Sequence, residues 1–147
     1  SADSSQFARK TVTGDCTVVA RVITQTNTSP YARAGVMIRD GIANNAMHAS
    51  SIVTPGSGLY MMSRSTTGGN ATSGSGGAGT VPYWLKVTRV GNVFTSSKST
   101  DGLTWTQMST AKTIAMGSTV EIGLVVCAYS NTSTGTATFD NVSITTP

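Results

Sequence analysis

Residues 34–40 read Ala-Gly-Val-Met-Ile-Arg-Asp. Within this stretch Val36 and Ile38 fall on one side of an extended backbone, and Met37 and Arg39 fall on the other. Such alternation with period two predicts a β-strand that has one face in a hydrophobic core. An arginine suits a sandwich interior poorly but can hold hydroxyl groups. We therefore expect a central strand whose Arg39 belongs to a ligand surface.

The rest of the chain repeats this pattern in short runs. No segment spaces its apolar residues by three or four with helix caps, and clusters of Gly, Asn, Pro and Ser separate the β-rich runs. Asp101-Gly102 is the strongest hairpin signal, whereas the Gly- and Ser-rich residues 66–79 predict a long loop. About ten to twelve strands and no helix predict an all-β fold, a two-sheet antiparallel jelly-roll sandwich. We expect strands at residues 16–23, 34–39, 46–53, 59–64, 83–90, 93–99, 103–108, 120–129 and 136–144, with shorter pieces near residue 12 and at 114–116.

The composition limits the classes of partner. At 147 residues we expect a single domain, residues 1–147, that is monomeric and is tethered to other domains of a larger secreted protein. Only 11% of the residues are charged, against about 25% in an average globular protein. No apolar run approaches the ~20 residues of a membrane helix, so we expect no membrane contact. The net charge of +4 is spread along the chain without a Lys/Arg cluster, which argues against nucleic-acid binding.

The acidic residues do not form a catalytic pair. Glycoside hydrolysis needs two carboxyl groups roughly 5–10 Å apart, but Glu121 is the only glutamate and no two acids share a strand face at a suitable spacing. His48, the only histidine, has no nucleophile motif nearby. One histidine and two separated cysteines do not make a zinc site. The sequence therefore predicts a domain that is not an enzyme. The aspartates lie at expected strand ends and turns: Asp3, Asp15, Asp40, Asp101 and Asp140.

The candidate ligand surface is the face of the sheet that carries Arg39. His48, Tyr60 and Arg64 have the matching parity in their own strands, so they join this face if the strands are neighbours. The face would then offer planar hydrogen-bond donors and an aromatic ring, which are the groups that bind a carbohydrate. Trp84 is the alternative stacking residue.

Each of these side chains also has a purely structural interpretation. An arginine on a strand is commonly solvated or ion-paired, His48 can be an exposed or hydrogen-bonded strand residue, and Tyr60 can be ordinary packing. Parity assigns faces within one strand but does not show which faces coincide. We expect residues 66–79 and 129–135 to form the rim of the surface if it binds a ligand.

Several blocks, in order, resemble the bacterial laminin-G-like domains of the concanavalin A-like lectin/glucanase superfamily. The resemblance spans nearly the whole chain and implies the concanavalin A-like jelly roll. The superfamily hosts lectins, glycanases, carbohydrate-binding modules and domains of unknown role, so the fold by itself does not choose a function. The blocks are residues 14–22, 34–39, 82–94, 99–105, 123–126 and 137–144, which include Ala-Gly-Val-Met-Ile-Arg at 34–39 and Pro-Tyr-Trp-Leu-Lys-Val-Thr-Arg at 82–89.

The resemblance also raises two structural questions. Cys16 and Cys127 stand where the family pattern has a glycine and a small polar residue, and we expect them to form a disulfide between an early and a late strand. The alternative is two buried free thiols. A structural Ca²⁺ is common in relatives, and the resemblance implies Asp140 as its carried-over ligand, with Asp3 as a second candidate, although most calcium ligands can be backbone carbonyls. The alternative for Asp140 is a turn cap.

The leading hypothesis is a noncatalytic carbohydrate-binding module that recognises a poly- or oligosaccharide on one sheet face. Its alternative is a structural or adhesive domain of a secreted or cell-surface protein that binds no sugar. An uncharacterised hydrolase ranks third, because no paired carboxylates support it.

Overall fold

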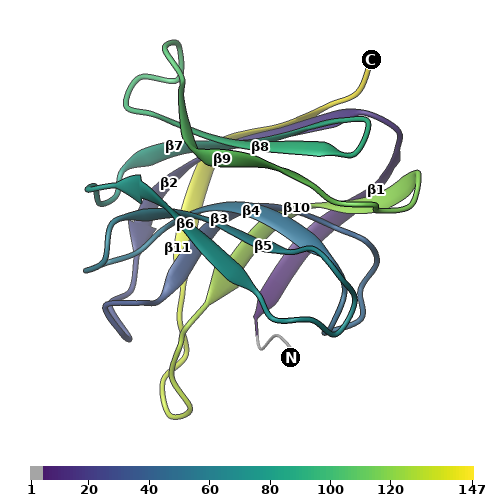
Figure 1. The fold of residues 1–147 in the computed structure, drawn as a ribbon. Helices are drawn as coiled ribbons and strands as arrows, with labels where there is room; N and C mark the ends of the chain where they lie inside the picture. Colours follow the sequence, from purple (N-terminus) through teal and green to yellow (C-terminus); the bar gives the residue numbers. More distant parts are fainter. Residues whose placement is uncertain (1–4) are drawn as a thin grey trace.

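Residues 5–147, which the computed structural model describes, form eleven β-strands and no helix (Figure 1). None of these residues belongs to a helix long and apolar enough to cross a membrane. The strands are β1 (Gln6–Thr13), β2 (Cys16–Gln25), β3 (Arg33–Arg39), β4 (His48–Val53), β5 (Leu59–Arg64), β6 (Thr72–Gly77), β7 (Tyr83–Val90), β8 (Val93–Ser99), β9 (Thr106–Thr113), β10 (Thr119–Cys127) and β11 (Ala137–Thr145).

Two antiparallel sheets pack face to face, as Figure 1 shows. The six-stranded sheet has the order β1-β10-β3-β4-β5-β6, and the five-stranded sheet has the order β11-β2-β7-β8-β9. Neighbouring strands in each sheet are often distant in sequence, as in a jelly roll. The expected all-β two-sheet sandwich is therefore confirmed, and β3 lies in the interior of the six-stranded sheet, between β10 and β4.

The core lies between the sheets and is built by the alternation seen in the sequence. Val36 and Ile38 of β3 face inward and are fully buried, as are Val18 of β2, Leu85 of β7 and Phe94 of β8. Burying one such side chain stabilises the fold by roughly 1.5–3 kcal/mol. Because inward positions are taken by these residues, Arg39 and its neighbours of the same parity lie on the opposite, outer face of the sheet.

Gly35 is required where β3 and β4 approach each other. A Cβ atom at this position would overlap the carbonyl oxygen of Ser51 and lie 2.9 Å from the Cα atom of Ile52. Both are backbone atoms of the neighbouring strand, which cannot move without breaking the ladder between the strands. The glycine therefore sets the close spacing of the two strands that carry Arg39 and His48.

The Gly-rich residues 66–79 differ from expectation because they contain β6, an edge strand paired with β5. Gly76 lies against β9 so closely that a Cβ atom would overlap the side chain of Met108. Glycine thus allows an edge strand to pass close to the opposite sheet, which composition alone interprets as a loop.

The turn that the Asp101-Gly102 signal predicts extends further than expected. The carboxylate Oδ1 of Asp101 accepts hydrogen bonds from the backbone N–H groups of Leu103 and Thr104, at 2.8 and 2.9 Å. These bonds lower the pKa of Asp101. They also hold residues 103–105 out of the sheet, so β9 begins at Thr106 and not at residue 103.

The predicted disulfide is wrong, since both cysteines are free. Cys16 begins β2 near the start of β10, where the backbone N–H of Gly14 donates to the carbonyl of Ser118, whereas Cys127 is the last residue of β10. At ~3.3 Å per residue the ends of β10 are roughly 26 Å apart, while a disulfide needs Cα atoms within about 7 Å. The alternative of two free thiols holds, although Cys127 is only partly buried.

Candidate functional site

The strand register brings three of the predicted site residues into one row. On the outer face of the six-stranded sheet Arg39 pairs with His48, and His48 pairs with Arg64. Tyr60 lies on the same face of β5. Trp84 does not join them, because it belongs to β7 of the other sheet, where it lies beside the guanidinium of Arg21.

The loops next to this row enclose Arg64. Its side chain is 1% exposed, and its nitrogens donate to the carbonyl oxygens of Asn44 at 3.3 Å, Ala46 at 3.1 Å and Gly69 at 3.0 Å. Arg64 thus joins two loops to the sheet and is not presented to a ligand. The geometry matches the structural interpretation of this side chain.

An apolar cluster occupies the middle of the outer face. Met37 of β3, Ile52 of β4 and Val125 of β10 are buried there with Met62, and Tyr60 packs against their edge. Tyr60 is therefore part of a hydrophobic floor, and it lies outside the hollow that the rest of this face forms.

That hollow has a volume of about 790 Å³ and lies over β10, β3 and β4. Arg39 and His48 line it, although both are largely buried, with 4% and 6% exposure. The guanidinium of Arg39 donates to the carbonyl of Ala43 at 2.6 Å. Met37 and Ile52 supply an apolar floor and Ser50 a hydroxyl group. The hollow therefore combines apolar and polar surface in one concave site.

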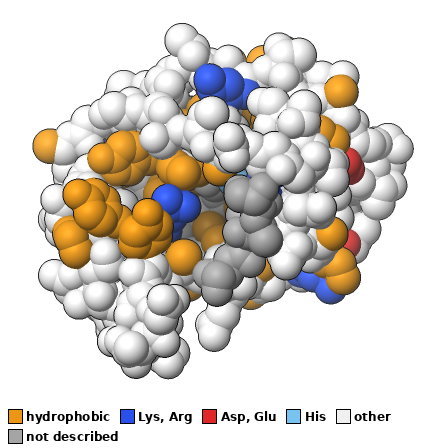
Figure 2. Space-filling model, turned by 60° about the horizontal axis from the view of Figure 1, so that its bottom comes forward, with side chains coloured by type: hydrophobic (Ala, Val, Ile, Leu, Met, Phe, Trp, Pro, Cys, Tyr) orange, Lys and Arg blue, Asp and Glu red, His pale blue; other side chains and the backbone are white. Residues whose placement is uncertain are grey.

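Tyr129 and Arg33 lie at one rim of this hollow, and Tyr31 lies beside Tyr129. Tyr129 and Tyr31 are each 55% exposed, and their ring centroids lie 6.0 Å apart. The guanidinium of Arg33 lies 5.3 Å from the centroid of the Tyr129 ring. Tyr129 has φ of 52°, a conformation that is rare for a residue with a side chain. Figure 2 shows the molecule from this side, with hydrophobic side chains gathered around a basic one.

Of the two segments expected at the rim, residues 129–135 contribute Tyr129, Asn131 and Gly135 to the lining of the hollow, whereas none of residues 66–79 lines it. Arg33 and Tyr31 were not expected there. Arg33 could have been found, because it continues the outer-face parity of Arg39 backward along the same strand. Tyr31 precedes the strand in a loop, where parity gives no signal.

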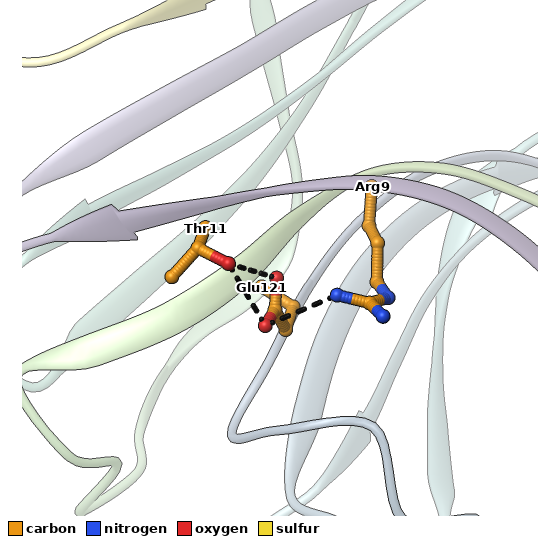
Figure 3. Close-up of polar contacts among 3 residues, drawn as sticks. All are labelled: Arg9, Thr11 and Glu121. Carbon is orange, nitrogen blue, oxygen red and sulfur yellow. Dashed lines mark hydrogen bonds and ion pairs between the residues drawn. The ribbon is translucent and has the colours of Figure 1, made fainter.

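A second hollow of about 220 Å³ adjoins the first, and Arg39 and Ser5 line both. Arg9 of β1 lines the smaller one. Beside it, Glu121 of β10 accepts hydrogen bonds from Thr11 Oγ1 on both carboxylate oxygens, at 3.0 and 2.9 Å, and pairs with Arg9 at 3.3 Å (Figure 3). Among the described residues, Glu121 is the only carboxylate on the outer face of this sheet.

The calcium expectation rests on Asp140 and Asp3. Both oxygens of the Asp140 carboxylate accept hydrogen bonds from Arg21, one of them at 2.7 Å. These bonds lower the pKa of Asp140 and raise that of Arg21. Asp3 lies outside the described residues, and within residues 5–147 no group of three His, Cys, Asp or Glu side chains could hold a metal ion. The described part of the chain therefore gives Asp140 an ion-pair role, and calcium remains a prediction.

Several solved structures have a fold similar to that of this chain. A functionally unknown protein from Saccharomyces cerevisiae is 24% identical, with a TM-score of 0.73 over 99% of this chain and 76% of that one. A xylan β-1,4-xylosidase from Bacillus halodurans is 16% identical, with a TM-score of 0.73 over 96% of this chain. The carbohydrate-binding module CBM66 from Bacillus subtilis is 15% identical, with a TM-score of 0.65 over 99% of this chain and 84% of that module. This chain spans only 30% of the length of the xylosidase.

The comparison with protein-family models identifies a family for this chain. No curated protein sequence is significantly similar to this chain. A model of the family described as "Protein of unknown function (DUF1349)" matches residues 1–147. The expected superfamily resemblance is thus supported at the level of the jelly-roll fold, while no comparison supports the laminin-G-like group in particular.

Proposed function

This chain belongs to the family of proteins of unknown function DUF1349, and we propose that it is a noncatalytic carbohydrate-binding domain. The observation that carries the proposal is the hollow on the outer face of the six-stranded sheet with the exposed ring of Tyr129 at its rim. Its volume of about 790 Å³ lies within the range of roughly 300–1,000 Å³ that is common for small-molecule sites.

The lining suits a sugar because a sugar ring has apolar C–H faces and a polar edge of hydroxyl groups. The exposed ring of Tyr129 offers a flat surface on which a sugar ring can stack, and its hydroxyl group can form a hydrogen bond with the sugar at the same time. Arg33, Asn131 and Ser50 supply further donors and acceptors around the hollow. An apolar floor with a few polar groups is the usual composition of a specific ligand site.

Two similar structures support this proposal. One is named as a carbohydrate-binding module and one as a xylosidase. At 15% and 16% identity they establish a shared fold, so the site itself must carry the functional argument. Secretion is also a proposal, supported by the scarcity of charged residues. Attachment to further domains is another, supported by the xylosidase, of whose chain this fold forms only 30%.

The surroundings of Glu121 support a noncatalytic function. Its carboxylate is held by Thr11 and Arg9 (Figure 3), and no second carboxylate among the described residues lies on that face. Both mechanisms of glycoside hydrolysis need a pair of carboxyl groups across the scissile bond. The described residues of the outer face offer only one carboxyl group, that of Glu121.

The test is binding of the purified chain to an array of plant, algal and bacterial glycans, followed by titration of each glycan that binds. Tyr129→Ala is expected to weaken saturable binding about tenfold, since loss of one stacking contact of about 1.4 kcal/mol has this effect. Leu103→Ala is the control, because Leu103 is 84% exposed on a turn of the other sheet. Binding that is unchanged by Tyr129→Ala would place the site elsewhere, and absence of binding across the array would favour the structural or adhesive alternative.

A further inference from the structure

We propose that the glycan bound in this hollow is acidic, and that its carboxylate pairs with Arg33. The inference rests on the proposed carbohydrate-binding function and specifies its ligand. The distribution of charge around the hollow carries it.

The described residues that line the two hollows carry charge of only one sign. Arg33 and Arg39 line the larger hollow and Arg9 the smaller, and no described lining residue is an aspartate or glutamate. Glu121, the one carboxylate among the described residues of this face, lines neither hollow, and its charge and that of Arg9 offset each other, so the positive charge comes from Arg33 and Arg39. A concave site with charge of one sign concentrates the electrostatic potential and attracts ligands of the opposite charge.

Arg33 differs from the other arginines in what it contacts. Within residues 5–147 its guanidinium forms no ion pair, and its notable neighbour is the ring of Tyr129 at 5.3 Å. Its hydrogen-bond donors at the rim therefore remain available to a ligand. The other five arginines each have an oxygen partner in the chain: Arg9 with Glu121, Arg21 with Asp140, Arg39 with Ala43, Arg64 with Asn44, Ala46 and Gly69, and Arg89 with Gly91, Met116 and Gly117.

The geometry at Arg33 suits a carboxylate on a sugar ring. A guanidinium presents parallel N–H donors that match the two oxygens of a carboxylate, a match that a neutral hydroxyl group cannot offer. The contact with Tyr129 limits the freedom of the arginine, so less conformational entropy is lost when the pair forms. Because the same tyrosine ring can stack on a sugar, a uronic acid would engage both side chains at once. A sulfate ester presents similar oxygens and is the second source of this chemistry.

The experiment compares acidic glycans with neutral forms of the same chains. Polygalacturonate, alginate and hyaluronan are each titrated against the 147-residue chain beside their carboxyl-reduced counterparts. Carrageenan, which carries sulfate esters and no uronic acid, provides the sulfate arm. We expect at least one acidic glycan to bind tenfold or more tightly than its reduced form, with affinity that falls as salt rises from 50 to 200 mM. Preference for the sulfated chain over all uronate chains would assign the anion as sulfate and overturn the carboxylate assignment.

Arg33→Gln is expected to remove the preference for the acidic form while leaving weaker binding of the reduced form. Lys112→Gln, which removes the same charge on the edge of the other sheet, is expected to leave the preference intact. Thermal unfolding checks that both variants fold. Equal binding of acidic and reduced forms, or an unchanged preference in Arg33→Gln, would overturn the acidic-ligand inference and leave the proposed function standing. Binding to neutral array glycans alone would have the same meaning, whereas no glycan binding at all would overturn both.

Discussion

Replacement of Arg64 by methionine tests whether this arginine stabilises the fold, in contrast to Arg33 at the rim of the hollow, which we propose binds the ligand. The aliphatic part of methionine fills most of the space of the arginine stem, but it leaves the carbonyls of Asn44, Ala46 and Gly69 without their donor. Arg33→Met is the matched variant, because Arg33 lies on the same face and forms no ion pair within residues 5–147.

The magnitude follows from the three hydrogen bonds. A hydrogen bond to a charged group contributes about 1.5–3 kcal/mol, so the lower end of this range for three bonds gives a loss of about 4.5 kcal/mol. A domain of this size loses about 3–4 °C of Tm per kcal/mol, so Arg64→Met is expected to lower Tm by about 15 °C. Arg33→Met loses none of these bonds, and its free energy of unfolding is expected to change by less than about 0.5 kcal/mol.

Urea denaturation and glycan titration on both variants test the reasoning. We expect opposite results: Arg64→Met unfolds at lower urea but binds like the parent chain at temperatures where it is folded, and Arg33→Met keeps its stability but loses affinity. An Arg64→Met variant that is as stable as the parent yet no longer binds would refute the account, since Arg64 would then act on the ligand and not on the loops.

Three further outcomes are expected. Gly35→Ala is expected to lower the free energy of unfolding by about 3 kcal/mol or more in urea denaturation, because its Cβ overlaps the backbone of β4; a change below about 1 kcal/mol would contradict the close approach. Thiol titration is expected to find two reactive groups in denaturant without reductant. In the native state Cys127 is expected to react faster, since Cys16 is buried and burial raises the pKa of its thiol. No reactive group in denaturant would restore the disulfide. In acid unfolding, Asp140→Asn is expected to be less stable than the parent chain above about pH 4, and the difference in stability is expected to shrink below that pH. The bonds from Arg21 depress the pKa of the folded Asp140 carboxyl group, so the contribution of this group to stability is lost as pH falls through the folded pKa. A difference in stability that persists at pH 2 would rule out the ion pair as its source.

Much of the fold could be predicted because strand alternation is a local property of the backbone. Val36 and Ile38 face the core, and the row from Arg39 through His48 to Arg64 forms on one face as parity allowed. Two predictions failed where the outcome depended on distant contacts. The Gly-rich edge strand β6 is held by β5 and β9, and the two cysteines lie near opposite ends of β10.

By itself the sequence determined which side chains leave the core, since successive residues of an extended chain must point to opposite faces. Only the tertiary structure decided which of those outward side chains remain available. Arg64 and Arg33 are equivalent by parity, yet the loops that carry Asn44 and Gly69 close over the first while the second stays at the rim beside Tyr129. The reason is that a side chain is covered by segments far away in the chain, whose paths no local pattern around that side chain can encode.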